Sequence, residues 1–282
     1  MAAGVSIVSP AAMPAASATR DQRDVTMSST EIARRLLDAY ETGIPIAPVR
    51  SEISGLAAAY AVQRATYDAW VKAGRKLAGH KIGLTAKAVQ EQLGVHEPDY
   101  GVLFGDMILE SGAHIGPRKV LQPRVEPEVA FILKSDLVGE NLTAQEVIAA
   151  TDYVVPAVEV CGSRVKGWDI RFEDTVADNA SSGLVVLGGR KWKPDLAKLA
   201  DVAVQVRLNG SVVAEGRGAA CLGNPANAVA WLAGALTRLG DRLRAGSVVM
   251  SGALAKMVPA EAGHRFDADF GEFGMVTIEF DR

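Results

Sequence analysis

The chain has 282 residues, of which 49% are hydrophobic and 22% are charged, and its formal net charge at pH 7 is −3. This composition is that of an ordinary globular protein with a large core. The small negative charge argues against nucleic acid or an anionic membrane as the main partner. The sequence contains no run of 18 apolar residues that would predict a membrane-spanning helix. Two cysteines, Cys161 and Cys221, form neither a disulfide framework nor a metal-ligand spacing, so we expect a reducing, cytoplasmic location.

The first 27 residues differ from the rest because they are rich in Ala, Ser and Pro and show little periodicity. They lack the basic start and long apolar centre of a secretory signal, and they match a transit peptide poorly. We expect 1–27 to be a disordered extension, with Met27 as an alternative start. A single domain is expected over 28–282, with a helical part over about 28–95 and a β-rich part over about 96–282.

Helical patterns come first along the chain. Ser28 and Glu31 have the spacing of a capping box, and the apolar residues that follow predict a helix over 29–41. The Ala-rich stretch 54–73 predicts a second helix, which Gly74 ends. The N-terminal part of the domain is therefore expected to be helical.

A third, short helix is expected between Thr85 and Gly94, with Val89 and Leu93 on its apolar side. Beyond it the pattern changes mostly to apolar or alternating segments of strand length. These segments predict strands at 128–133, 154–160, 184–187, 247–251 and 275–280.

A β-hairpin is the clearest local prediction in the second half. The strands 202–208 and 211–215 are joined by Asn209 and Gly210, a pair that suits a type I′ turn. Helices that cluster early and strands that cluster late predict an α+β fold with one mixed core.

Two further helices are expected among these strands. Thr143 and Glu146 have capping-box spacing and open a short helix. Asn224 and Pro225 suit the N-cap and first position of a longer helix that ends near Leu239. Both helices interrupt the strand-rich half and would cover its sheets.

Three carboxylates suggest chemistry. Glu126 and Glu128 are two residues apart in a stretch that runs into an apolar strand, so an extended chain would place both on one face. Glu159 lies in a similar apolar setting, where an isolated carboxylate is costly. Oxygen ligands of this kind suit a hard divalent cation such as Mg²⁺ or Mn²⁺. The alternative interpretation is a set of surface salt bridges, for example with Arg124 or Arg164.

Other polar segments are less decisive by themselves. Lys81 lies in a glycine-flanked stretch and either projects into a pocket or is a solvated loop lysine, while His80 has no second metal ligand nearby. Asp99 lies beside a proline in a turn-like context. The segment 174–183 is dense in small polar residues and suits a substrate cradle or a turn. The sequence contains no phosphate-binding loop, dinucleotide glycine pattern or nucleophile elbow.

Seven stretches of the sequence together match one known family. They are HKIGLT (80–85), QLGVHEPDYGVLFGDM (92–107), LQPRVEPEVAFIL (121–133), PAVEVCGSR (156–164), DTVADNASSG (174–183), CLGNPANAVAWLA (221–233) and SGALAKMV (251–258). On these stretches the chain resembles the 2-keto-4-pentenoate (2-hydroxypenta-2,4-dienoate) hydratase family of the fumarylacetoacetate hydrolase superfamily, from about residue 32 to the end. One departure is Pro127, where an alanine is more familiar, and a proline there predicts an edge or a bulge.

The resemblance implies a fold and an activity. The fold would be a mixed β-roll of the fumarylacetoacetate hydrolase type with an N-terminal helical part. The activity would be that of a hydro-lyase that converts 2-hydroxypenta-2,4-dienoate to 4-hydroxy-2-oxopentanoate during the meta-cleavage breakdown of aromatic compounds. The protein would act on a small 2-oxo or 2-hydroxy dienoic acid as a homo-oligomer, a pentamer or decamer, and would associate with another enzyme of its pathway.

The resemblance also implies residue roles. Mg²⁺ or Mn²⁺ would bind to Glu126, Glu128 and Glu159. Lys81 would stabilise the substrate enolate and Asp99 would transfer protons. Asp178, Asn179 and Ser182 would hold the carboxylate end of the substrate or order the water, and Ser182 would also take part in catalysis. Ser251 and Gly252 would bind substrate by lining the same pocket.

Related activities on the same scaffold are alternatives. A 4-oxalocrotonate decarboxylase would use the same acids and lysine, and a 2-oxohept-4-ene-1,7-dioate hydratase would need an additional cation, for which Arg164 and Arg171 are available. A non-catalytic partner subunit is a third alternative, although the expected functional residues are all present. An acylpyruvate hydrolase would need a His–Glu pair near a lid, and His96 and Glu97 lie instead in a turn-like stretch.

Overall fold

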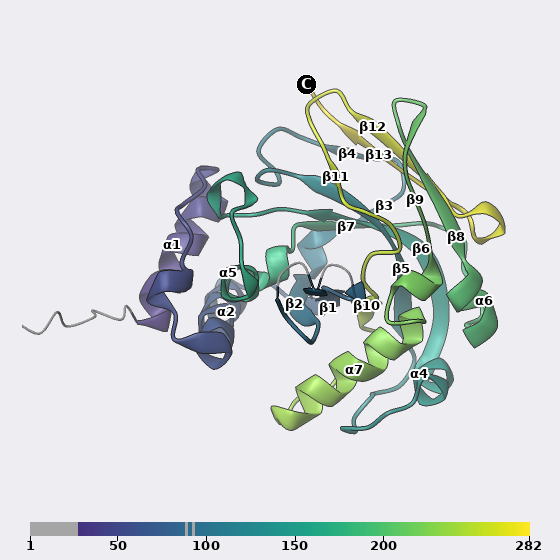
Figure 1. The fold of residues 1–282 in the computed structure, drawn as a ribbon, viewed down its shortest axis with the longest axis horizontal. Coiled ribbons are helices and arrows are strands. Elements are labelled where there is room, and N and C mark those ends of the chain that lie inside the picture. Colours follow the sequence, from purple (N-terminus) through teal and green to yellow (C-terminus); the bar gives the residue numbers. More distant parts are fainter. Residues whose placement is uncertain (1–27, 88–89, 92–93) are drawn as a thin grey trace, which may run out of the picture.

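Two mixed β-sheets dominate the computed structural model, which describes residues 28–87, 90–91 and 94–282 (Figure 1). In the larger sheet the strand order is β2-β1-β10-β5-β6-β7-β3, and β11 also pairs with β5. The strands of this sheet are β1 (Leu77–Gly83), β2 (Asp99–Phe104), β3 (Ile108–Glu110), β5 (Arg124–Leu133), β6 (Thr151–Cys161), β7 (Leu184–Leu187), β10 (Val248–Met250) and β11 (Val258–Pro259).

The smaller sheet has the order β4-β13-β12-β8-β9. Its strands are β4 (Ala113–Ile115), β8 (Ala203–Leu208), β9 (Ser211–Arg217), β12 (Arg265–Asp269) and β13 (Met275–Phe280). The helices are α1 (Ser29–Thr42), α2 (Gly55–Lys72), α4 (Ala144–Ala150), α5 (Phe172–Ala177), α6 (Leu196–Asp201) and α7 (Pro225–Arg238). Mixed sheets with helices packed around them confirm the predicted α+β class.

The long antiparallel pair β5–β6 lies at the centre of the larger sheet, and its middle is buried on both faces. Val129, Ala130 and Phe131 are consecutive and fully buried, which requires cover on both sides of the strand. Helix α7 packs against α4 and β1, and α1, α2 and α5 gather at the other side of the molecule (Figure 1). A polar side chain on this central pair is therefore held in a water-poor, rigid setting.

A second, smaller apolar cluster joins the N-terminal helices to the rest. Ile32 and Leu36 of α1 pack with Val62 of α2 and Val176 of α5. The apolar stripe of α1 follows helical spacing, so the sequence pattern alone explains this face. The cluster fixes α5, and with it the polar segment that follows α5, against the larger sheet.

Several local predictions are confirmed. The helices expected over 29–41 and 54–73 are α1 and α2, and the Ser28 side chain accepts a hydrogen bond from the Glu31 amide at 3.2 Å. The Asn-Gly hairpin is β8–β9, with Asn209 and Gly210 at φ 48° and 85° as a type I′ turn requires. In the described residues, we find no helix long and apolar enough to cross a membrane.

Two predictions fall on residues outside the described part of the chain. These are the extension over 1–27 and the positions of Val89 and Leu93 in the third helix. The described strand β1 lies within the segment predicted to be helical over 28–95, and it pairs with β2 and β10 in the larger sheet. The boundary predicted near residue 95 therefore does not separate a helical unit from the sheets.

The prediction that Pro127 marks an edge or a bulge is wrong. Pro127 lies in the central strand β5, in unbroken register opposite Val158 of β6. Its carbonyl accepts a hydrogen bond of 2.9 Å from the Leu254 amide, so its nitrogen points to the same side, away from β6. On that side the partner strand is interrupted between β10 and β11. A missing N–H group at this position costs no ladder hydrogen bond.

Candidate active site

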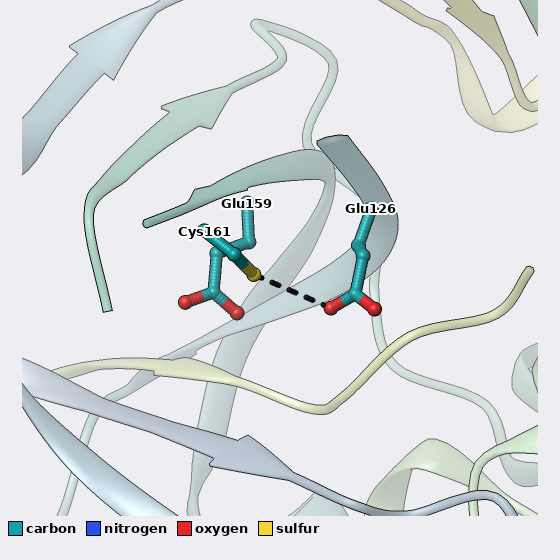
Figure 2. Close-up of side chains that lie close together, drawn as sticks. All are labelled: Glu126, Glu159 and Cys161. Carbon is teal, nitrogen blue, oxygen red and sulfur yellow. Dashed lines mark hydrogen bonds between the residues drawn. The ribbon is translucent and has the colours of Figure 1, made fainter. Parts of the chain in front are cut away.

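The register of β5 and β6 places Glu126 directly opposite Glu159. Because side chains alternate along a strand, Glu128 lies on the same face as Glu126, and Cys161 on the same face as Glu159. Figure 2 shows the side chains of Glu126, Glu159 and Cys161 converging from the two strands. Potential ligand atoms of these three residues all lie within 4.8 Å of one another. Cross-strand pairing thus brings residues 33 or more positions apart in sequence into one cluster.

The acids are poorly satisfied within the protein. Glu128 and Glu159 are almost completely buried. Among the described residues, neither carboxylate oxygen of Glu159 accepts a hydrogen bond, nor does Oε1 of Glu128. The other oxygen of Glu128 accepts one from the Gly252 amide at 2.8 Å. Burial without enough hydrogen-bond donors is costly for a carboxylate, so this arrangement favours positive charge beside these oxygens.

Burial and mutual repulsion alter the pKa values of these acids. Burial raises the pKa of Glu159 to about 7, with Lys81 opposing the shift and Glu126 adding to it. Burial and the two neighbouring acids raise the pKa of Glu128 well above its ordinary value. Burial also raises the pKa of Glu126. The three carboxyl groups therefore repel one another as anions, as in other carboxylate clusters.

Lys81 provides positive charge at this cluster. It is buried in β1, and its Nζ lies 3.4 Å from Oε2 of Glu159. Burial alone would lower the pKa of Lys81, but Glu159 and the other nearby acids outweigh burial and raise it. Lys81 is consequently an ammonium ion in a buried site and not the solvated loop lysine that was the alternative interpretation.

Asp99 begins β2 on the same side of the sheet as Lys81. The register pairs Gly83 with Asp99 and Lys81 with Gly101, so all four lie on one face. Asp99 is buried, one oxygen accepts a hydrogen bond from Thr175 Oγ1 at 3.3 Å, and the other has no partner among the described residues. Burial raises the pKa of Asp99 while Lys81 opposes the shift. Asp99 is therefore a buried strand carboxyl on the face of Lys81 and not a turn former, and its predicted catalytic role stays a prediction.

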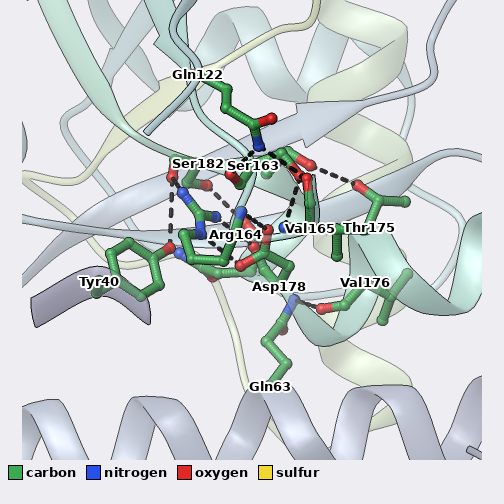
Figure 3. Close-up of polar contacts among 12 residues, drawn as sticks. Tyr40, Gln63, Gln122, Ser163, Arg164, Val165, Thr175, Val176, Asp178 and Ser182 are labelled. Atoms are coloured by element: carbon green, nitrogen blue, oxygen red, sulfur yellow. Dashed lines mark hydrogen bonds and ion pairs between the residues drawn. The ribbon is translucent and has the colours of Figure 1, made fainter. Parts of the chain in front are cut away.

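Arg164 and Asp178 form a buried ion pair behind the site (Figure 3). The backbone amide and Nε of Arg164 donate to the two carboxylate oxygens of Asp178 at 2.9 and 2.5 Å. Its remaining guanidinium nitrogens donate to the carbonyls of Ser182 and Asp178 at 3.0 and 2.8 Å. The Tyr40 ring lies 4.0 Å from the guanidinium carbon. These contacts give Asp178 a structural role, and its predicted contact with substrate stays a prediction.

Asn179 and Ser182 hold the same segment against β2. The Asn179 side chain accepts from the Val102 amide at 2.8 Å and donates to the Val102 carbonyl at 3.0 Å. Ser182 Oγ donates to the Asn179 carbonyl at 2.7 Å. The polar segment is thus a set of internal hydrogen bonds that shapes the wall near Asp99. The predicted substrate contacts of both residues stay predictions.

Ser251 and Gly252 follow β10 and reach the acids from the other side. Gly252 has φ 100° and its amide holds Glu128. Ser251 is fully buried, and its carbonyl accepts a hydrogen bond from Cys221 Sγ at 2.7 Å. Gly252 therefore positions a predicted metal ligand, whereas its predicted contact with substrate stays a prediction.

Cys161 is the site residue that sequence reasoning missed. Its thiol donates to Oε2 of Glu126 at 3.4 Å (Figure 2). The signal was present, because Cys161 lies two residues after Glu159 in a strand and so shares its face.

Comparison with known proteins agrees with this geometry. Residues 69–280 match the family model for the fumarylacetoacetate (FAA) hydrolase C-terminal domain. The chain is 45% identical to 2-keto-4-pentenoate hydratase 1 of Dechloromonas aromatica (strain RCB) over 260 residues, covering 91% of this chain and 99% of the relative. It is 47% identical to the TodF product hydratase of Pseudomonas putida (strain F1) over 247 residues, covering 87% and 92%.

A solved structure shares the fold. The 4-oxalocrotonate decarboxylase from Pseudomonas putida G7, complexed with magnesium and adipate, superposes with a TM-score of 0.86 at 33% identity, covering 89% of this chain and 97% of that one. The fumarylacetoacetate hydrolase type of fold predicted from the sequence is thereby confirmed. Together with the extended identity to the hydratases, this shows that the chain belongs to the 2-keto-4-pentenoate hydratase family of the fumarylacetoacetate hydrolase superfamily.

Proposed function

We propose that the protein is a hydro-lyase that uses Mg²⁺ or Mn²⁺ to add water to 2-hydroxypenta-2,4-dienoate, giving 4-hydroxy-2-oxopentanoate. The observation that carries this proposal is the cross-strand pair of Glu126 and Glu159, in which the buried Glu159 carboxylate accepts no hydrogen bond from the described residues and lies 3.4 Å from Lys81 Nζ. The names of relatives at 45–47% identity, which are hydratases, support the same reaction.

The donor set fits a hard divalent cation. Glu126, Glu128 and Glu159 place three carboxyl groups around one region, and Lys81 is the cation in contact with them. Three acids against one ammonium leave the region negative, and a divalent ion would remove the repulsion that raises their pKa values. Oxygen ligands of this kind are those that Mg²⁺ and Mn²⁺ prefer. We therefore assign these three acids as the residues that would hold the metal.

Lys81 would act on the charge that develops on the substrate. When bound, the metal supplies Lewis-acid polarisation of the substrate's 2-oxygen. Lys81, fixed by Glu159 in a buried site, would place an ammonium group near the same oxygen and stabilise its negative charge as the dienol loses its proton. A preorganised buried charge is more effective than one in water, because it needs no reorganisation during the reaction.

Asp99 would move protons. Burial raises the pKa of its carboxyl group, and Thr175 fixes one of its oxygens. The hydroxyl proton of the dienol is lost, and a proton delivered to C5 gives the conjugated 2-oxo-3-enoate. Water then forms a bond to C4 and loses one proton, while C3 gains one. The sum is the addition of one water molecule, with Asp99 as the acid–base group of the scheme.

We further infer that the protein acts in the meta-cleavage breakdown of aromatic compounds, in the cytoplasm, as a homo-oligomer. The family to which it belongs supports this inference, and a pentamer or decamer is the expected assembly. Light scattering coupled to size-exclusion chromatography of the full chain tests the assembly directly. A monomer at micromolar concentration would contradict it.

A dicarboxylate substrate is the main alternative, in a decarboxylase or a dioate hydratase. The cation proposed for a second carboxylate, Arg164, donates through all three guanidinium nitrogens to Asp178 and Ser182, and Arg171 is exposed. Arg124 shares the face of Glu126, but its guanidinium lies 4.3 Å from the Trp168 ring, which already engages it. These contacts favour a substrate with a single carboxylate.

The test is product analysis with purified protein, Mg²⁺ or Mn²⁺, and two substrates supplied separately. Loss of the ultraviolet absorbance of 2-hydroxypenta-2,4-dienoate with formation of 4-hydroxy-2-oxopentanoate, abolished by EDTA, is the expected result. Release of CO₂ from 2-oxohex-3-enedioate without consumption of the dienol would overturn the hydratase and favour the decarboxylase. The Glu126→Gln and Glu159→Gln variants should lose turnover in either case.

A further inference from the structure

The carboxylate pair Glu126–Glu159 has two different neighbours, one at each end. On one side lies Glu128, two residues further along β5. On the other side lies Cys161, two residues further along β6, with its Sγ 3.4 Å from Oε2 of Glu126. The two neighbours differ in chemistry, since one offers a hard oxygen donor and the other a soft sulfur donor.

The sulfur end has the geometry of a ligand set. The potential ligand atoms of Glu126, Glu159 and Cys161 lie within 4.8 Å of one another, whereas Glu128 is not part of that group. Two ligands of one zinc-sized ion, at metal–oxygen distances of about 2.1 Å and a metal–sulfur distance of about 2.3 Å, are at most about 4.4 Å apart, so small side-chain rotations suffice.

An independent observation points to a ligand at this place. Glu159 is buried to 1% exposure, and neither of its oxygens has a hydrogen-bond partner among the described residues. Figure 2 shows its carboxylate beside the Cys161 sulfur. Glu128, by contrast, already has one oxygen held by the Gly252 amide at 2.8 Å. The Glu159 carboxylate, which accepts no hydrogen bond from the described residues and lies 3.4 Å from Lys81 Nζ, therefore faces the same small region as the thiol.

We propose that Cys161 makes this centre a binding site for thiophilic divalent ions such as Cd²⁺, Co²⁺ and Zn²⁺, held by Glu126, Glu159 and the Cys161 sulfur. Hard ions are held instead at the oxygen end, with Glu128 as the third acid. As the metal–sulfur bond forms, the thiol proton leaves to solvent and no electron is transferred. The two modes share Glu126 and Glu159, so binding is mutually exclusive and a thiophilic ion displaces Mg²⁺ or Mn²⁺. This inference rests on the proposed function in one respect, namely that these acids hold the catalytic metal.

The test is a Cd²⁺ titration of metal-free protein, followed by the ultraviolet absorbance of thiolate-to-cadmium charge transfer. Cys161→Ser removes the proposed ligand. Cys221→Ser is the matched control, because Cys221 is the other buried cysteine and donates to the Ser251 carbonyl. We expect the band in wild type and Cys221→Ser, and its loss in Cys161→Ser. Circular dichroism checks folding, and Cys161→Val is the second variant if the serine disturbs the strand.

Affinities separate this inference from the proposed function. Replacing a residue that only hydrogen-bonds to a metal ligand already changes metal affinity about 10–100-fold, so Cys161→Ser, which removes a proposed ligand, should weaken Cd²⁺ binding at least about tenfold. The Mn²⁺ affinity of Cys161→Ser should stay within about threefold of wild type. Glu128→Gln should instead weaken Mn²⁺ binding at least about tenfold and keep Cd²⁺ binding within about threefold of wild type. Absence of the band in wild type, or its survival in Cys161→Ser, would overturn the inference. If the band fails to behave as expected but the same protein preparations still hydrate the dienol with Mn²⁺, this inference is wrong and the proposed function stands. If the band behaves as expected but the wild-type protein does not hydrate the dienol with Mn²⁺, the proposed function is wrong and this inference stands.

Discussion

Gly101 lies against Ser182: a Cβ atom built on Gly101 would be 2.6 Å from Ser182 Oγ and would also overlap the Asn179 carbonyl. The polar segment that follows α5 can therefore approach β2 only because position 101 has no side chain. This close approach positions the wall of the site next to Asp99, two residues earlier in the same strand.

Gly101→Ala should lower both stability and activity. The added methyl group must displace the backbone carbonyl of Asn179, and overpacking of this kind costs roughly 1–3 kcal/mol. Urea denaturation measures the loss, and turnover of the dienol reports the effect on the site. Gly189→Ala is the control, because no atom lies within 4 Å of its added Cβ. Equal stability of the two variants would contradict the close approach.

The Arg164–Asp178 pair should be sensitive to loss of one partner. Arg164→Met leaves the Asp178 carboxylate buried without its donors, and removal of one member of a buried pair costs roughly 3–5 kcal/mol. Arg34→Met removes an exposed pair with Asp38 and should cost roughly 0.5 kcal/mol or less. Thermal unfolding of both variants distinguishes them. A small effect of Arg164→Met would show that the pair contributes little to the fold.

His80 should make the fold sensitive to acid. It is buried in β1, and burial lowers its pKa to about 4 from an ordinary value of 6.5. Because the folded-state pKa is the lower one, unfolding takes up a proton, and the stability is fully present above pH 6.5 and falls as the pH drops towards 4. The difference between these two pKa values corresponds to roughly 3 kcal/mol.

Comparison with a variant isolates the contribution of this histidine. The free energy of unfolding of His80→Gln, followed between pH 7 and 4, should fall less steeply than that of wild type. His96→Gln, at an exposed position, should keep the wild-type slope. Parallel curves for all three proteins would exclude His80 as the source of acid sensitivity.

Removal of the divalent metal should destabilise the protein. A ligand at 100 times its dissociation constant adds about 2.7 kcal/mol to the stability of the folded state. EDTA should therefore lower the unfolding temperature of wild type. The Glu126→Gln/Glu159→Gln double variant should not respond to EDTA, because two of the three acids that would hold the metal are gone. A double variant that still responds to Mg²⁺ would place the metal elsewhere.

The sequence alone predicts much of the fold, and the failures have a common cause. Capped helices and the Asn-Gly hairpin are local features, so α1, α2, α7 and β8–β9 follow from their own residues. The sequence does not predict strand β1, because Gly79 and Gly83 favour a loop. A Cβ on Gly79 would overlap the carbonyl of Val248, and one on Gly83 would overlap the Asp99 carboxylate. Glycine is needed at both positions for contacts that only the folded chain contains.

In the candidate site, as in the fold, some features follow from local sequence and others depend on the folded chain. The period of two along a strand predicts that Glu126 and Glu128 share a face, but the pairing of Glu126 with Glu159 depends on the register of β5 and β6, which no local pattern specifies. The contact of Arg164 with Asp178 is likewise not predictable from the sequence, because no local pattern brings together two residues that lie 14 positions apart. The sequence therefore predicts which acids belong to the candidate site, but it does not predict which group each acid faces.

Lys81→Met should remove most of the turnover while the fold persists. Lys81 is the ammonium beside Glu159, and loss of one preorganised electrostatic group costs about 10²–10³ in kcat. Lys81→Arg keeps the charge but not the compact point-charge geometry, so it should recover only part of the rate. Steady-state kinetics with saturating Mn²⁺, together with Mn²⁺ affinity measured by calorimetry, separates a role in charge stabilisation from a role in metal binding. If Lys81→Met lost turnover only through weaker Mn²⁺ binding, and saturation restored kcat, Lys81 would be a group that positions Glu159 rather than one that acts on the substrate.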